Sequence, residues 1–347
     1  GVPPFGFTPS LSAPPRRPAP PPPRCALLSM IDCPNGDPKT WQVGDCRVTR
    51  IMEMETVGGQ AWIMPAASRE LVRSVEWLAP DFADERGRMK FAIQLMVVDA
   101  PGGVRVAVDT CVGNDKKRPL DHWHMRSGPF LEHLKAAGFP PESVTHVFCT
   151  HLHTDHIGWN TRWEGGRWVP TFPRARYLFC RKEFEYWTGG GRAGADGEEG
   201  GIAEELADSV TPVVEAGLAE LVDAHHVLLD AGGTRLYLRP TVGHTPGHVS
   251  LMIESRGSKG IITGDCFHHP LQFTETAIGS RGDTSPEQAT RTREDLLKEF
   301  CGTPTLVFGT HFARPTVGVV RRHRKNFMLD TTVAAAREAA PAAHPKL

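Results

Sequence analysis

The 347-residue sequence lacks several features that each define a class of protein. Its formal net charge is −1, so no basic excess indicates a nucleic-acid partner and no charge excess indicates attraction to a membrane surface. No apolar run approaches the roughly 20 residues that a helix needs to span a bilayer. We therefore expect neither nucleic acid nor a membrane among its partners.

The eight cysteines include no C-x-x-C pair. In a chain of this length, scattered cysteines argue against a disulfide framework and against a cysteine-type structural zinc site. We predict reduced thiols that are mostly buried as small hydrophobic side chains. The stretch 1–24 is proline-rich and has no apolar segment of the signal-peptide type, so a cytoplasmic location is the expectation.

Composition divides the chain near residue 30. The segment 1–29 contains a run of prolines and cannot build a core, so it is predicted to be disordered or polyproline II. Residues 30–347 are predicted to form a single globular domain, in a chain that is 40% hydrophobic and 23% charged. Expected strand pairs followed by helices occur twice, which predicts two sheets packed face to face with helices outside.

Periodicity and turn residues place the individual elements. Strands are predicted at 46–54, 91–99, 104–109, 144–149, 177–179, 234–238, 248–254, 260–263 and 305–308. Helices are predicted at 69–78, 129–137, 182–187, 202–217 and 286–300, and a mobile glycine-rich loop at 189–201. Ser285 and Gln288 have the spacing of a capping box, with Pro286 at the first helical position.

Residues 151–156 read H-L-H-T-D-H, directly after an apolar run that is predicted to be a buried strand. Imidazole suits zinc and iron, and a carboxylate adds a hard anionic oxygen. A strand would send His151 and His153 to the same face, because side chains alternate with period two. Asp155 and His156 would then come from the following turn and point to a second position. The spacing therefore predicts two adjacent metals rather than one.

Three further candidate ligands, His244, Asp265 and His311, lie where expected strands end. Taken singly, an aspartate after a strand is more often a turn or cap residue, and a loop histidine is more often structural. Taken together with the H-x-H-x-D-H cluster, they complete the ligand set of a two-metal site.

The combination of T-H-L-H-T-D-H, G-H-T-P-G-H, T-G-D and G-T-H resembles the metallo-β-lactamase fold superfamily, over roughly residues 45–325. The resemblance implies the α+β four-layer αββα sandwich, with two mixed sheets inside and helices outside. It also implies two divalent metal ions, expected to be zinc, and a motif histidine, His248, that packs or hydrogen-bonds near the loop without binding metal. The implied ligands are His151, His153 and His244 for one ion and Asp155, His156 and His311 for the other, with Asp265 bridging both.

Two neighbouring divalent metals can share a water and lower its pKa towards neutrality, which generates hydroxide for attack on a carbonyl or phosphoryl centre. Asp155 is the candidate catalytic residue, because a carboxylate beside that water can accept its proton and pass it to the leaving group. We expect metal-assisted hydrolysis with no cofactor beyond the metals.

Within the superfamily, the chain is similar to the N-acyl homoserine lactone lactonase and methyl parathion hydrolase branch. The residues that carry this similarity are Asp109-Thr110, H-T-D-H-I-G-W-N and the D-C-F-H-H-P run from Asp265. The similarity implies a quorum-quenching lactonase acting on a small-molecule lactone or ester. The alternatives are an organophosphate or aryl-ester hydrolase, a β-lactamase, a glyoxalase II-like thioesterase and a mononuclear iron sulfur dioxygenase.

The substrate side of the site is less defined. Lactonases commonly place a tyrosine over the substrate carbonyl, but none of the three tyrosines lies in a matching motif. His269 is either a hydrogen-bond partner of a ligand or a plain loop histidine. The segment 54–89 is either a homodimer contact or a lid. The aromatic residues that follow the motif are either pocket walls or core residues, with core packing favoured: Trp159, Trp163, Trp168, Phe172 and Trp187.

Overall fold

The structure, a computed structural model, describes residues 28–31, 33–191, 202–335 and 337–339. Most of the predicted disordered segment and of the predicted mobile loop 189–201 lies outside these residues. Residue 29 is an exception, because strand β1 (Ser29–Ile31) pairs antiparallel with β3 and begins one residue before the expected domain boundary. No helix among the described residues is long and apolar enough to cross a membrane.

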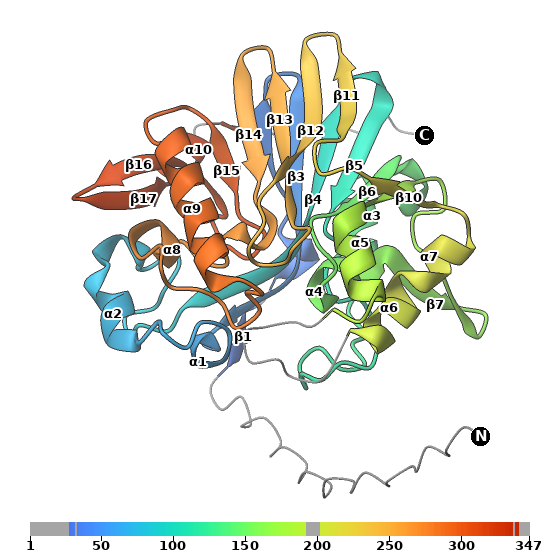
Figure 1. Cartoon of the computed structure of the whole chain (residues 1–347), viewed down its shortest axis with the longest axis horizontal. Coiled ribbons are helices and arrows are strands. Elements are labelled where there is room, and N and C mark those ends of the chain that lie inside the picture. The colour runs from blue at the N-terminus through green and yellow to red at the C-terminus, as the bar shows by residue number, and fades with distance from the viewer. Residues whose placement is uncertain (1–27, 32, 192–201, 336, 340–347) are drawn as a thin grey trace, which may run out of the picture.

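Two mixed sheets form the centre of the molecule (Figure 1). The nine-stranded sheet has the order β10-β9-β6-β5-β4-β3-β2-β18, with β1 added on β3, and its β5, β6, β9 and β10 run parallel to one another. Its strands are β2 (Lys39–Val43), β3 (Cys46–Val57), β4 (Lys90–Ala100), β5 (Val104–Val108), β6 (His146–Cys149), β9 (Arg176–Cys180), β10 (Ala219–Val222) and β18 (Glu338–Ala339).

The seven-stranded sheet runs in sequence order from β11 to β17, and only its β14–β15 pair is parallel among the described strands. Its strands are β11 (Val227–Ala231), β12 (Thr234–Pro240), β13 (Val249–Ser255), β14 (Ser258–Ile262), β15 (Leu306–Phe308), β16 (Val317–His323) and β17 (Asn326–Asp330). A separate hairpin is formed by β7 (Thr161–Glu164) and β8 (Arg167–Pro170).

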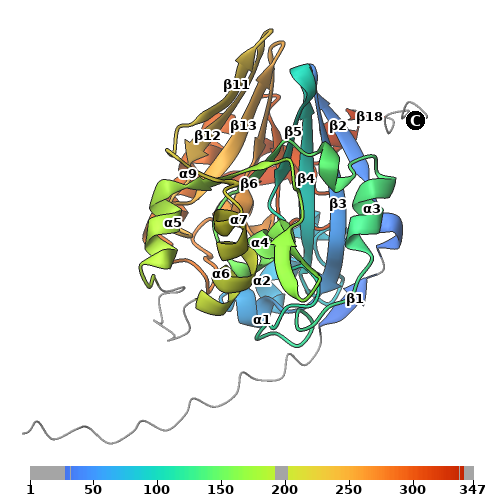
Figure 2. The ribbon, with the colours of Figure 1, turned by 90° about the vertical axis from the view of Figure 1, so that its right-hand side faces the viewer.

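Helices cover the outer faces of both sheets (Figures 1 and 2). The nine-stranded sheet is covered by α3 (Phe130–Ala136), α5 (Arg181–Thr188), α6 (Ala203–Ser209) and α7 (Thr211–Glu215). The seven-stranded sheet is covered by α8 (Leu271–Thr274) and α9 (Pro286–Phe300), with α1 (Gln60–Ile63) and α2 (Arg69–Ser74) nearby. The remaining helices are α4 (Thr154–Ile157) and α10 (Thr332–Ala335). This arrangement is the four-layer sandwich that the sequence predicts.

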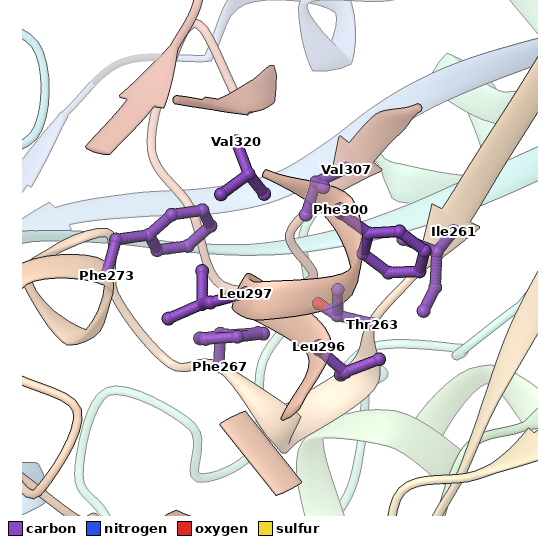
Figure 3. A pocket seen from close by; sticks show the side chains of 9 residues that line it. All are labelled: Ile261, Thr263, Phe267, Phe273, Leu296, Leu297, Phe300, Val307 and Val320. Atoms are coloured by element: carbon purple, nitrogen blue, oxygen red, sulfur yellow. The ribbon is translucent and has the colours of Figure 1, made fainter. Parts of the chain in front are cut away.

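The two sheets are held together by an apolar layer between them. Val98 and Val106 of the first sheet and Leu251 and Phe308 of the second all belong to this layer and are fully buried. Each such side chain contributes about 1.5–3 kcal/mol through removal of its surface from water. A separate outer core packs α9 on the second sheet, where Leu297 and other apolar side chains converge (Figure 3).

Two expected helical features are wrong in detail. The single helix predicted at 202–217 is two helices, α6 and α7, because Pro212 lacks the amide that a continuous helix would use. The capping box before α9 does not form: Ser285 is the N-cap residue but its side chain accepts no backbone bond, and Gln288 donates to Thr292 instead. Pro286 does lie in the first turn, as predicted.

The cysteines of the described residues are unpaired thiols, as predicted, and five of them are buried. The segment 54–89 contributes Val72, Leu78 and Phe82 to the outer core of the second sheet. Its backbone carbonyl at Ile63 accepts a hydrogen bond from the amide of Arg281, in the loop before α9. Its roles as a homodimer contact or a lid stay predictions.

The β2–β3 turn approaches the end of β13 too closely for any side chain at Gly44. This glycine has φ of 60°, and a Cβ there would lie 2.1 Å from the carbonyl oxygen of Ser255. Gly102 has φ of 78° but an added Cβ would meet nothing within 4 Å, so it is a matched control.

We predict that Gly44→Ala lowers the free energy of unfolding more than Gly102→Ala does. In both variants the left-handed backbone lowers the free energy of unfolding by about 1–2 kcal/mol. In Gly44→Ala the steric clash lowers it by a further amount of about 1–3 kcal/mol. Urea denaturation of both variants measures the difference. Equal losses would contradict the described contact between the two sheets.

Candidate metal centre

The H-x-H-x-D-H residues lie on a loop and a short helix rather than on a strand. Strand β6 ends at Cys149, and His153 is the N-cap residue of α4. The expected period-two placement of His151 and His153 on a strand is therefore wrong. The chain turns sharply enough that both side chains still point to one position, while Asp155 and His156 leave the first turn of α4.

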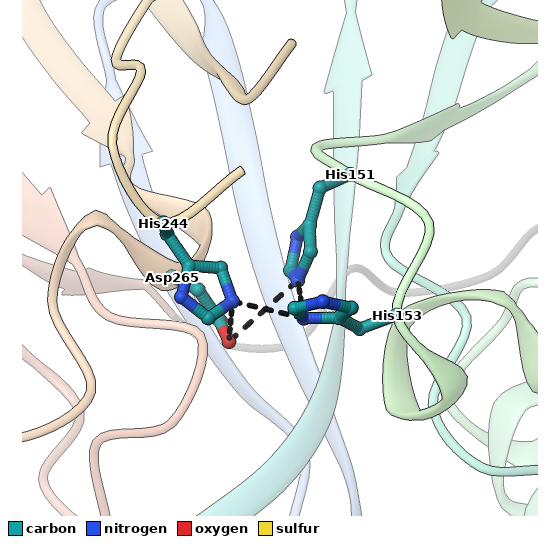
Figure 4. A group of neighbouring side chains, drawn as sticks. All are labelled: His151, His153, His244 and Asp265. Atoms are coloured by element: carbon teal, nitrogen blue, oxygen red, sulfur yellow. Dashed lines mark hydrogen bonds and ion pairs between the residues drawn. The ribbon is translucent and has the colours of Figure 1, made fainter. Parts of the chain in front are cut away.

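The first cluster contains His151, His153, His244 and Asp265 (Figure 4). His153 Nδ1 lies 3.0 Å from His151 Nε2 and 2.9 Å from His244 Nε2. Asp265 Oδ2 lies 3.3 Å from His244 Nε2 and 3.7 Å from His151 Nε2. Ligand atoms of a tetrahedral zinc site, at about 2.0–2.1 Å from the ion, are about 3.3–3.4 Å apart. The cluster therefore has the dimensions of a single-ion site.

The second cluster contains Asp155, His156 and His311. His311 Nε2 lies 3.3 Å from His156 Nε2 and 3.5 Å from Asp155 Oδ2. The other carboxylate oxygen of Asp265, Oδ1, lies 3.2 Å from His156 Nε2 and 3.0 Å from His311 Nε2. Asp265 thus presents one oxygen to each cluster, which is the arrangement of a carboxylate shared by two ions.

The buried polar atoms also fit a cation. Asp265 Oδ1 is buried and has no hydrogen-bond partner among the described residues. An unsatisfied buried carboxylate oxygen is costly, and a metal ion between Asp265 and the imidazoles would satisfy it. The donor set of imidazoles and carboxylates suits zinc and related divalent ions.

Burial and charge set different protonation states in the two clusters. Burial holds the pKa of His151 and of His153 well below its usual value, which favours the neutral, metal-binding form. Burial alone would also lower the pKa of His311, but the carboxylates of Asp265 and Asp155 outweigh it and raise that pKa to about 9. Metal binding at the second cluster therefore requires the loss of protons.

Asp283 orients the ring of His244. Its Oδ1 lies 2.9 Å from His244 Nδ1, and its Oδ2 accepts a hydrogen bond from the amide of Ser280 at 3.1 Å. The side chain is fully buried, and its pKa falls to about 2 because the hydrogen bond and charge of His244 outweigh burial. Such carboxylate partners fix the tautomer and orientation of a metal-binding histidine.

Asp109 lies beside His156 as Asp283 lies beside His244: Asp109 Oδ2 is 3.1 Å from His156 Nδ1. Asp109 adopts a left-handed backbone, φ 53°, at the end of β5. Thr150 donates to Asp109 through both its amide (2.8 Å) and its hydroxyl (3.1 Å). The first residue of the ligand loop is therefore attached to the carboxylate that faces His156. Sequence reasoning noted Asp109 only as part of the family resemblance and missed Asp283.

His248 hydrogen-bonds next to the site, as predicted. Its Nε2 accepts from the amide of Asp265 at 3.0 Å, and its Nδ1 lies 2.8 Å from the hydroxyl of Thr241. Burial lowers the pKa of His248 to about 3, so the ring is neutral and can accept at Nε2. His248 thereby positions the backbone of the shared carboxylate.

The alternative of His269 as a partner of a ligand is wrong, and the neighbouring histidine lies at the site instead. His269 Nε2 donates to the carbonyl oxygen of Phe82 at 2.8 Å, in the outer core. His268 Nε2 lies 3.1 Å from Asp265 Oδ2, and its ring stacks on His311 with centroids 5.7 Å apart. A pair of adjacent histidines in a loop gives no sequence signal for which one faces inward.

The aromatic residues divide between core and site. Trp159 and Phe172 are core residues, as favoured. Trp187 packs edge-on against His153, with ring centroids 5.1 Å apart, although it also belongs to the core. The other two, Trp163 and Trp168, contact each other in the β7–β8 hairpin.

Two of the tyrosines are engaged away from the ligand clusters. Tyr177 is buried in the core, where its hydroxyl donates to the carbonyl oxygen of Asn160 at 3.0 Å. The hydroxyl of Tyr237 donates to Glu254 at 3.3 Å, within the second sheet. Tyr186 packs edge-on against Trp187, with ring centroids 5.0 Å apart.

We predict that Asp283→Asn weakens zinc binding by about 10–100-fold, because His244 loses the carboxylate that orients it. Competition titration against a chromophoric chelator measures the affinity. Asp45→Asn is the matched control, because Asp45 is exposed and its side chain pairs with Arg256 at the surface. Equal affinities of the two variants would contradict the orienting role.

Comparisons with known proteins identify the family and the fold. Residues 95–311 match the Metallo-beta-lactamase superfamily. N-acyl homoserine lactonase AttM from Rhizobium radiobacter is 26% identical over 182 residues, which is 48% of this chain and 57% of that protein. An N-acyl homoserine lactonase from Bacillus sp. is 26% identical over 186 residues, 51% of this chain and 59% of that protein. The chain thus spans under two thirds of the length of these relatives.

Solved structures show the same fold at low identity. AidC, a dizinc quorum-quenching lactonase in complex with a product, has a TM-score of 0.66 at 20% identity, covering 84% of this chain and 96% of that chain. The hydrolase AbOPH of the β-lactamase superfamily has a TM-score of 0.68 at 21% identity, with the same coverage. The matched family region, residues 95–311, covers more than half of the sequence. It contains all the clustered histidines and aspartates that were selected from the sequence. The chain therefore belongs to the metallo-β-lactamase superfamily.

Proposed function

We propose that this chain is a metal-dependent hydrolase that opens N-acyl homoserine lactones. The observation that carries the proposal is the buried Asp265 carboxylate, which offers one oxygen to each of two ligand clusters at 3.0–3.7 Å. The similarity to curated lactonases at 26% identity supports a lactone as the substrate. We infer that residues 30–347 form one catalytic domain, since the apolar layer joins strands of both sheets.

In this proposal each cluster holds one divalent ion, expected to be zinc. His151, His153 and His244 hold the first, Asp155, His156 and His311 hold the second, and Asp265 bridges them. When bound, such a pair supplies hydroxide at neutral pH and polarises the substrate carbonyl.

Asp155 is the proposed proton acceptor. Its side chain is 14% exposed, compared with 5% for Asp265, so it is the more accessible of the two carboxylates. A carboxylate on the accessible side of the metal centre can take the proton of the attacking water and return it to the leaving oxygen of the opened ring. The small-molecule substrate would enter from the same side.

We predict that the zinc-loaded chain hydrolyses N-acyl homoserine lactones, and that a chelator abolishes this activity until zinc is restored. Asp155→Asn should lower kcat by about 10²–10⁴-fold, because the amide cannot accept the proton. Asp45→Asn, at an exposed position, should keep the parent rate. A pH-stat assay over short and long acyl chains measures ring opening.

The same metal pair would serve an organophosphate or aryl-ester hydrolase, so the substrate panel includes a nitrophenyl phosphotriester. Release of nitrophenol from a chain that leaves every lactone intact would overturn the lactonase proposal in favour of that alternative.

A further inference from the structure

The first turn of α5 lies between the two loops that supply the three histidines of the first ligand cluster. Glu183, in this turn, is buried and its carboxylate contacts both loops. Oε1 accepts a hydrogen bond from the amide of Leu152, the residue between His151 and His153, at 3.2 Å. Oε2 accepts from the amide of Gly247 at 3.0 Å and from the hydroxyl of Thr245, next to His244, at 2.7 Å.

The same helix supports the ring of His153 from outside. Trp187, four residues after Glu183, donates its indole N–H to Glu183 Oε1 at 2.6 Å. Its ring lies edge-on to His153, with centroids 5.1 Å apart. A helix places residues four apart on one face, so Glu183 and Trp187 act together toward the ligand loops.

Gly247 shows how close this approach is. A Cβ at Gly247 would lie 2.3 Å from the amide nitrogen and 2.6 Å from the Cα of Glu183. The loop and the helix can meet at this distance only because the residue has no side chain.

We propose that Glu183 is a positioning residue that couples the two ligand loops and thereby sets the metal affinity of the His151, His153 and His244 cluster. The carboxylate contacts the backbone beside the ligands and the ring that supports one of them, and its hydrogen bonds within the described part of the chain involve no ligand side chain. This inference rests on the metal site of the proposed function and not on its substrate.

The chemistry of the four donors explains why a carboxylate is needed. An ionised carboxylate accepts hydrogen bonds at both oxygens, whereas an amide presents N–H groups at one end. In Glu183→Gln, the amide nitrogen would therefore face two of the four donors. If that nitrogen takes the place of Oε2, Thr245 can rotate its hydroxyl to accept but the backbone N–H of Gly247 loses its acceptor. If it takes the place of Oε1, the backbone N–H of Leu152 loses its acceptor, so either orientation breaks at least one contact to a ligand loop.

The test measures Co²⁺ binding to the metal-free full chain, because Co²⁺ reports its ligand geometry through visible absorption. We expect Glu183→Gln to lower the Co²⁺ affinity about tenfold and to change the absorption spectrum of the loaded protein. Thr245→Val, which removes one donor and no charge, should lower the affinity less and in the same direction. Val319→Ala is the stability control, because it truncates a buried side chain of β16 between the sheets.

The outcomes separate positioning from general support of the fold. If Glu183 only supported the fold, Glu183→Gln would lower the Tm of the metal-free and the loaded forms equally, as we expect for Val319→Ala. A Glu183→Gln variant with the same Co²⁺ affinity and the same spectrum as the parent chain would overturn the inference. If that variant does not fold, unchanged Co²⁺ affinity in Thr245→Val overturns it. A parent chain that cleaves no lactone, with weakened Co²⁺ binding in the variants, would refute the proposed substrate and leave this inference standing.

Discussion

The shared carboxylate of Asp265 is the interaction on which the rest of the site depends. It is buried, and its two oxygens lie within 3.7 Å of ring nitrogens from five histidines: His151, His156, His244, His268 and His311. A buried anion is tolerated only where it is paired or binds a cation. Burial alone would raise the pKa of Asp265. The charges of His156 and His311 outweigh burial and hold the pKa of this carboxyl well below its usual range.

The fold satisfies this requirement by bringing loops from both sheets to one place. The H-x-H-x-D-H loop follows β6 of the first sheet, while His244, Asp265 and His311 follow β12, β14 and β15 of the second. The apolar layer between the sheets determines how these loops meet. Carboxylates behind the ligands then complete the arrangement, because Asp109, Asp283 and Glu183 each hold a ligand ring or loop in place.

Strand and helix patterns predicted two sheets with helices outside, and the family resemblance implied the four-layer sandwich and the division of the ligands between two ions. The candidate ligands could be selected because their spacing and their places after expected strands are local signals. Sequence reasoning could not predict the residues behind the ligands. Asp283 is 39 residues from His244 in the chain, and Glu183 is 62 residues from Thr245, so only the packed fold shows these pairs. The division of the predicted helix 202–217 into two helices has a local cause in Pro212, whereas the choice between His268 and His269 depends on how one loop turns against the outer core.

We propose that the two ligand clusters joined by Asp265 hold two metal ions in each chain. The most direct test is elemental analysis of the purified full chain, loaded with zinc and freed of excess metal, with protein measured independently. We predict two zinc ions per chain, and we expect a chelator to remove them together with the activity. A single ion per chain at saturating metal, above all a single iron, would contradict a two-metal site and favour mononuclear chemistry.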